Sequence, residues 1–76
     1  MRDPNRIDPL LAKLAEAWRK WPDQRFGQFM CNFFEACQVD PFYIEDDYWE
    51  VALQAYIDGN DPKEAIVNYR KLKHGY

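Results

Sequence analysis

The side chains with the most capacity for chemistry are four acids near the middle of the chain, Glu45, Asp46, Asp47 and Glu50. Clustered carboxylates can bind magnesium or act as a general acid and base. Acids are also typical of the first turn of a helix, where they interact favourably with the helix dipole. A hydrolytic site would need a Lys or His from elsewhere in the chain. We therefore interpret the cluster as a helix start and keep a metal-dependent enzyme as a second alternative.

The two thiols and the one imidazole do not form a second site. Cys31 and Cys37, if helical, are about 9 Å apart along the axis, and a disulfide tolerates about 7 Å between Cα atoms. We expect free thiols, as in a reducing compartment, with Cys31 more reactive than Cys37. With His74 as the only histidine, a Cys/His zinc site has too few ligands. No phosphate-binding glycine loop, GxSxG or HExxH motif occurs, so we expect no metal and no cofactor.

Composition limits the elements that can position these residues. Seventy-six residues make one small domain, and an aromatic content of 17% supplies a core without staples. The net charge of −3 argues against a uniformly basic surface for nucleic acid. No apolar run approaches the roughly 20 residues of a membrane span, and the first residues do not form a secretory signal. These features predict a cytoplasmic location and no membrane partner.

Four Asp-Pro pairs punctuate the chain, and each is a candidate helix start, because Asp caps a helix and Pro suits its first position. Apolar residues then recur at helical spacing. The predicted fold is all-α, a compact four-helix single domain over residues 1–76 with an aromatic-rich core. Asp23 and Asp47 are the expected caps of the second and third helices, and Gly59 and Gly75 are the expected stops of the third and fourth. Residues 38–44 form the longest connector, in which 41–44 is either a helical turn or extended. The predicted helices span about 9–21, 24–37, 46–58 and 62–74.

The second predicted helix carries polar residues on its wet side. Gln28 and Asn32 lie one turn apart and are a candidate partner-binding patch. Gly27, at the flank of the apolar stripe, predicts a close approach by a neighbouring Trp or helix. Arg25 is unusual in a first helical turn, and we expect it to form a structural ion pair with Asp46 or Asp47, with Glu45 as a further candidate.

The third predicted helix is apolar over most of its circumference. Such a helix is either packed between two neighbours or exposes one face to a partner. One stripe, which includes Trp49 and Leu53, suits the core. The other consists of Tyr48, Val51 and Ala55, which we predict to bind a larger protein or a second copy of the chain.

Three segments, RIDPLLAKLAEAW, PDQRFGQ and DPFYIEDD, resemble a family of small phage and bacterial proteins of unknown function with the pattern PDxRxGQ…N…FYxED. The resemblance covers residues 6–53. It implies an intracellular, often phage-encoded, stand-alone protein, and no activity is attached to it. It points to the following residues: Pro22, Asp23, Arg25, Gly27, Gln28, Asn32, Tyr43, Glu45 and Asp46.

Small size, the lack of catalytic motifs and the phage setting favour a non-enzymatic protein that occupies a surface of a larger partner. A phage accessory protein or an anti-defence inhibitor, for example an anti-CRISPR protein, is the concrete form of this hypothesis. The first alternative is a small nucleic-acid-binding regulator, a less expected partner class. It would use the basic end of the last helix: Arg70, Lys71, Lys73 and His74.

Overall fold

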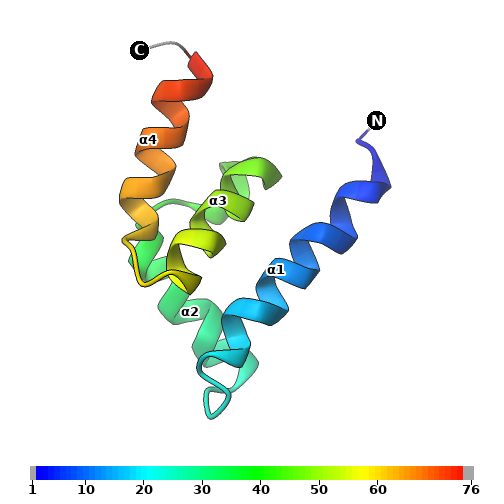
Figure 1. Cartoon of the computed structure of the whole chain (residues 1–76), viewed down its shortest axis with the longest axis vertical. Helices are drawn as coiled ribbons and strands as arrows, with labels where there is room; N and C mark the ends of the chain where they lie inside the picture. Colours follow the sequence, from blue (N-terminus) through cyan, green and yellow to red (C-terminus); the bar gives the residue numbers. More distant parts are fainter. Residues whose placement is uncertain (1, 75–76) are drawn as a thin grey trace.

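The computed structural model describes residues 2–74, and within them the chain is entirely helical apart from turns. Four α-helices and two short 3₁₀ turns make up the fold (Figure 1). The all-α prediction is therefore confirmed. None of the helices in the described residues is both long and apolar enough to cross a bilayer. Their bounds are η1 Pro4–Arg6, α1 Ile7–Arg19, α2 Phe26–Cys37, η2 Pro41–Tyr43, α3 Asp46–Ile57 and α4 Pro62–His74.

Helix α1 begins earlier than predicted because the first Asp-Pro pair, not the second, starts the helical segment. The Asp3 carboxylate accepts a hydrogen bond from the Asn5 amide at 2.9 Å, and η1 runs directly into α1. Pro9 is tolerated within the first turn, where a backbone N–H has no helical acceptor in any case. The helix ends at Arg19, so Trp21 lies in the turn before α2.

Helix α2 begins at Phe26, and Asp23 is not its cap. Arg25 holds the N-cap position, where its backbone N–H donates to Gln28 Oε1 at 2.9 Å. Gln38 ends the helix with a left-handed backbone, at a φ of 53°, and donates its N–H to the Phe34 carbonyl. The connector that follows is helical first and extended afterwards, because Asp40 caps η2 through the Phe42 amide and Ile44 is extended.

Helix α3 lies between α1 and α4 (Figure 1) and packs on both, most extensively on α4. Glu45, not Asp47, occupies its N-cap position. At its other end Gly59, with a φ of 80°, reverses the chain, as predicted. The Asn60 amide donates to Ala55 O at 2.8 Å and the Gly59 amide to Tyr56 O at 3.3 Å, the bond pair of a Schellman motif. Asp61 then caps α4 through the Lys63 amide. The predicted stop at Gly75 lies outside the described residues.

The core is a chain of aromatic rings where α2 meets α3. Phe29 and Phe33, both buried, stack with ring centroids 6.3 Å apart, and Tyr56 meets Phe33 edge to face at 5.2 Å. Trp49 packs against Phe33 from α3 at 5.8 Å. Cys37 is fully buried beside this cluster while Cys31 is exposed, and both are free thiols, as predicted. Burial, with the nearby Asp61 carboxylate, raises the pKa of Cys37 to about 12.

Candidate functional site

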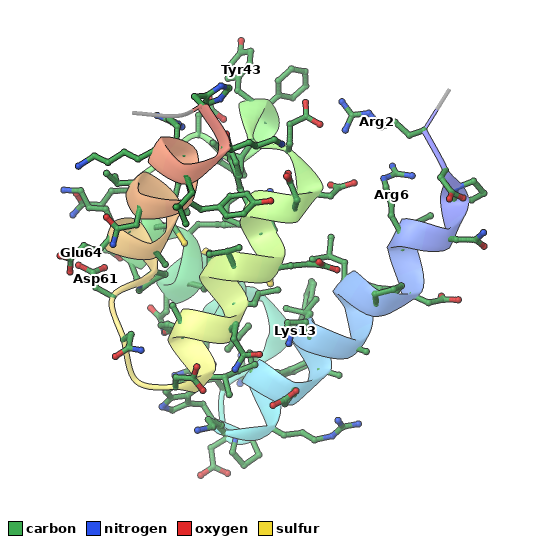
Figure 2. The ribbon with its side chains drawn as sticks, turned by 45° about the horizontal axis from the view of Figure 1, so that its top comes forward. Arg2, Arg6, Lys13, Tyr43, Asp61 and Glu64 are labelled. Carbon is green, nitrogen blue, oxygen red and sulfur yellow. The ribbon has the colours of Figure 1, made fainter. Side chains whose placement is uncertain are left out.

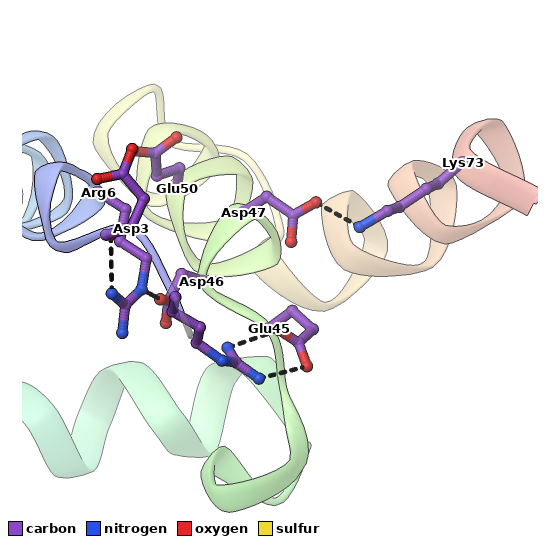
Figure 3. Close-up of a pocket in the computed structure, with 8 residues that line it drawn as sticks. Asp3, Arg6, Glu45, Asp46, Asp47, Glu50 and Lys73 are labelled. Carbon is purple, nitrogen blue, oxygen red and sulfur yellow. Dashed lines mark hydrogen bonds and ion pairs between the residues drawn. The ribbon is translucent and has the colours of Figure 1, made fainter.

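The four acids singled out in the sequence border an open depression of about 570 Å³ at the start of α3, here called the charged depression (Figure 3). Arg2 binds Glu45 with two hydrogen bonds of 2.7 and 3.1 Å, and Arg6 forms an ion pair with Asp46. Asp47 turns to the other side and binds Lys73 of α4 at 2.6 Å. Glu45, Asp46 and Asp47 are therefore each directed to a different cation. Among residues 2–74 no three potential ligands converge on a metal position.

Asp47 has two further contacts, one to α4 and one within α3. The Tyr69 hydroxyl donates to Asp47 Oδ2 at 3.0 Å, and the Tyr48 amide donates to Oδ1 at 3.1 Å. Partial burial disfavours the charged carboxylate, yet the hydrogen bonds from Lys73 and Tyr69 outweigh it and hold the pKa of Asp47 below its ordinary value. The same hydrogen bond raises the pKa of Lys73. The contacts of Asp47 with Lys73 and Tyr69 therefore form a structural clamp between α3 and α4.

The predicted ion pair between Arg25 and the acids of α3 is wrong in its cation. Asp46 pairs with Arg6 and Asp47 with Lys73, whereas Arg25 lies exposed at the start of α2. The N-terminal segment runs past the start of α3, so Arg2 and Arg6 reach the acids first (Figure 2). The ion pairs thus brace η1 and α1 against α3 and leave α2 out.

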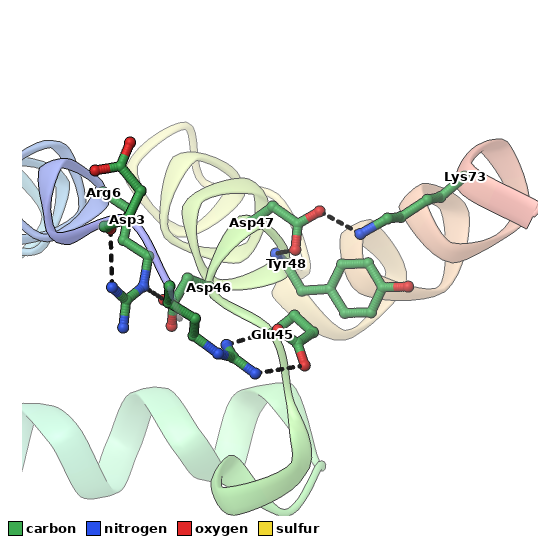
Figure 4. A network of polar contacts seen from close by, with 8 residues as sticks. Asp3, Arg6, Glu45, Asp46, Asp47, Tyr48 and Lys73 are labelled. Carbon is green, nitrogen blue, oxygen red and sulfur yellow. Dashed lines mark hydrogen bonds and ion pairs between the residues drawn. The ribbon is translucent and has the colours of Figure 1, made fainter.

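The predicted binding face on α3 is not a free surface. Tyr48 and Ala55 each retain 8% of their exposure, and Val51 is half-buried. Tyr48 meets Tyr69 of α4 edge to face at 5.2 Å (Figure 4 shows Tyr48 beside Lys73). Helix α3 is apolar on two sides because α1 covers one and α4 the other. The prediction that Tyr48 and Ala55 present a docking face is therefore wrong.

The basic end of α4 is exposed, but part of its charge is engaged. The Lys73 ammonium is paired with Asp47 and also lies 5.1 Å from the centroid of the Tyr48 ring. The Arg70 guanidinium lies 5.8 Å from the centroid of the same ring. His74 Nε2 lies 3.5 Å from the Tyr48 hydroxyl. Lys71 is exposed. These contacts give the basic residues a structural role against α3.

The Gln28–Asn32 face borders an open hollow of about 620 Å³ on the outer side of α2. The Gln28 side chain accepts a hydrogen bond from the backbone N–H of Arg25, the N-cap residue. The Asn32 side-chain amide donates to Gln24 Oε1 at 3.3 Å. The predicted close approach at Gly27 is wrong, because a Cβ placed there would meet nothing within 4 Å. Both side-chain amides are thus hydrogen-bonded to residues that precede α2. The binding role predicted for Gln28 and Asn32 stays a prediction.

The feature that sequence reasoning missed is a groove between α1 and the α2–α3 pair, here called the apolar groove. It has a volume of about 250 Å³. Leu11, at its α1 edge, is 53% exposed although it is a large apolar residue. Among residues 2–74, no charged side chain lines the groove. Its lining residues are Leu10, Leu11, Leu14, Met30, Phe33, Phe34, Pro41, Trp49 and Leu53.

Beside the apolar groove, η2 presents two aromatic side chains to water, here called the aromatic turn: Phe42 and Tyr43. Phe42 is 85% exposed and Tyr43 76% exposed, and their rings meet edge to face at 5.0 Å. Tyr43 projects from the molecule near the start of α3 (Figure 2). The signal for this feature in the sequence was the pair of consecutive aromatic residues in a connector, outside every predicted apolar stripe.

No known family model, no curated protein and no solved structure matches this sequence.

Proposed function

We propose that this chain is a non-enzymatic protein-binding module that acts through the apolar groove. The carrying observation is the groove itself, whose lining is almost wholly apolar and includes the half-exposed Leu11. Apolar surface left open to water costs free energy that a partner recovers by covering it, at roughly 25 cal/mol per Å². Grooves of this kind between helices commonly receive an apolar segment of another chain.

The ion pairs of the charged depression favour a binding module over an enzyme. A catalytic carboxylate pair needs two acids aimed at one reacting atom, and a magnesium site needs several oxygens around one point. In the described residues, Glu45, Asp46 and Asp47 are instead neutralised one by one by Arg2, Arg6 and Lys73. Ion pairing of this kind stabilises the helix assembly, which favours a structural role for these acids over a catalytic one.

The resemblance to small phage and bacterial proteins suggests a setting for this function. An accessory protein or an anti-defence inhibitor, such as an anti-CRISPR protein, would act by covering a surface of its target and needs no catalytic group. That biological role is a proposal that rests on the resemblance, on small size and on the apolar groove.

A photo-crosslinker tests the proposal in living cells. p-Benzoylphenylalanine is introduced in place of Leu11, at the groove, and in place of Glu16, which is exposed on the other side of the same helix. We expect discrete protein adducts from position 11 and none from position 16. Equal adducts from both positions, or none from position 11, would refute a binding role for the groove.

A further inference from the structure

We propose that a second copy of this chain occupies the apolar groove, with Phe42 of each copy inserted into the groove of the other. This inference rests on the proposed function and names the partner. It follows from three observations: the size of the groove, the rigidity of the aromatic turn and the position of one relative to the other.

The groove fits a phenyl ring. Apolar cavities of about 150 Å³ lined by Leu, Ile and Phe side chains already accept a benzene-sized molecule, and this groove offers about 250 Å³. Its walls include the aromatic residues Phe33, Phe34 and Trp49. Aromatic rings in contact favour tilted or edge-to-face packing, which stabilises the pair beyond the contribution of the buried area.

Phe42 is held where it cannot fill its own groove. The Asp40 carboxylate accepts the Phe42 amide at 3.0 Å, and the Asp40 carbonyl accepts the Tyr43 amide at 3.2 Å. Pro41 restricts the backbone further through its fixed φ. The ring is 85% exposed. A backbone that is already fixed loses little entropy on association, which favours this turn as an anchor.

The anchor and the groove are adjacent in the chain and in space. Pro41 lines the groove and Phe42 is the next residue. When an anchor lies next to its receptor site, a two-fold axis close to that point lets both insertions occur at once, which makes a closed, self-complementary interface. A foreign helix could fill the groove, but it would leave the aromatic turn uncovered.

The area suits a modest dimer. Phe42 and Tyr43 together expose roughly 300 Å². Reciprocal docking buries this area on both copies together with the groove walls that it covers, which gives roughly 1,200 Å² in total, the lower end of specific interfaces. We expect concentration-dependent dimers.

Sedimentation equilibrium over about 1 μM to 1 mM tests the inference. The mass should rise from that of one chain to that of two. Phe42→Ser should keep the chain monomeric throughout this range. Leu72→Ser is the matched control, because Leu72 is 82% exposed on α4 and is not part of the groove, and it should dimerise like the parent chain. Circular dichroism checks that both variants are folded.

A mixing experiment separates a specific insertion from general stickiness. Leu11→Glu puts a charge at the groove edge and keeps Phe42, whereas Phe42→Ser keeps the groove. Neither variant should dimerise alone, yet their mixture should form a heterodimer with one insertion, detectable by native mass spectrometry. A parent chain that is monomeric at every concentration, equal losses in Phe42→Ser and Leu72→Ser, or no heterodimer in the mixture would overturn the inference. If position 11 still crosslinks to a different protein, the proposed function survives and only the identity of the partner is wrong.

Discussion

Two glycines of this chain occupy opposite situations, and the difference predicts opposite effects of the same substitution. Gly27 lies within α2 with open space around its missing Cβ, whereas Gly59 has a φ of 80° that side chains rarely adopt. Gly27→Ala should raise stability by up to about 1 kcal/mol, because Ala is the better helix former and the unfolded chain has less freedom to lose. Gly59→Ala should lower it by about 1 kcal/mol or more.

Urea unfolding of the parent and of both variants measures these changes. A loss of stability in Gly27→Ala would mean that a neighbour meets the added methyl group. An unchanged midpoint in Gly59→Ala would contradict the left-handed turn at the end of α3.

Single-residue partners were the least predictable level. The acids of α3 were identified from the sequence as a helix start, but Arg25 was predicted to be the cation that pairs with them. The assignment failed because the reach of a side chain depends on where its backbone runs, and η1 brings Arg2 and Arg6 to Glu45 and Asp46. Spacing along one helix contains no information about a segment that arrives from elsewhere in the chain.

At the scale of elements, periodicity and capping residues located all four helices, and the errors lie at the ends. Helices α3 and α4 match their predicted bounds closely because Gly59 and the Asp61-Pro62 pair act locally. Helix α1 begins early because the chain offers two Asp-Pro pairs and the first of them, capped by Asp3, starts the helical segment. The predicted exposure of Tyr48 was wrong because a doubly apolar helix predicts a neighbour on each side without saying whether that neighbour belongs to the same chain.

Because of the clamp between α3 and α4, the free energy of unfolding should fall as the pH becomes acidic. The pKa of Asp47 is lower in the folded chain than its ordinary value of 3.8. The folded state therefore binds fewer protons, so the contribution is fully present above the unfolded pKa and is lost as pH falls through the folded pKa. Because Asp47 is partly exposed, Asp47→Asn should cost only about 0–1 kcal/mol at neutral pH.

Thermal unfolding of the parent chain and Asp47→Asn between acid and neutral pH checks this dependence. The two curves should converge at the acid end. Glu16→Gln, which removes one exposed carboxylate from the middle of α1, is the control, and its stability should equal that of the parent chain at every pH. A gap for Asp47→Asn that persists at the acid end would show that the contact does not depend on charge.

At the scale of the whole molecule, helix composition did not predict shape. The Cα radius of gyration is 12.5 Å, against about 11.4 Å for a compact chain of this length. The excess reflects α1, which diverges from α4 across α3 (Figure 1). The walls of the apolar groove come from α1, α2, η2 and α3, and the angles between these elements are set by packing. A helix-by-helix sequence pattern does not contain such angles.

The tight reversal that joins α3 to α4 also has a consequence for the order of folding. Neighbouring helices joined by a Schellman turn close with little loss of chain entropy, whereas α1 must find α3 across a long intervening segment. The α3–α4 hairpin should therefore be formed in the transition state, and α1 should dock afterwards.

Stopped-flow chevrons of two matched variants measure this order. Ala55→Gly, on the α4 side of α3, should slow folding, whereas Ala17→Gly, at the buried position of α1, should mainly speed unfolding. Equal slowing of folding by both would place α1 in the nucleus as well.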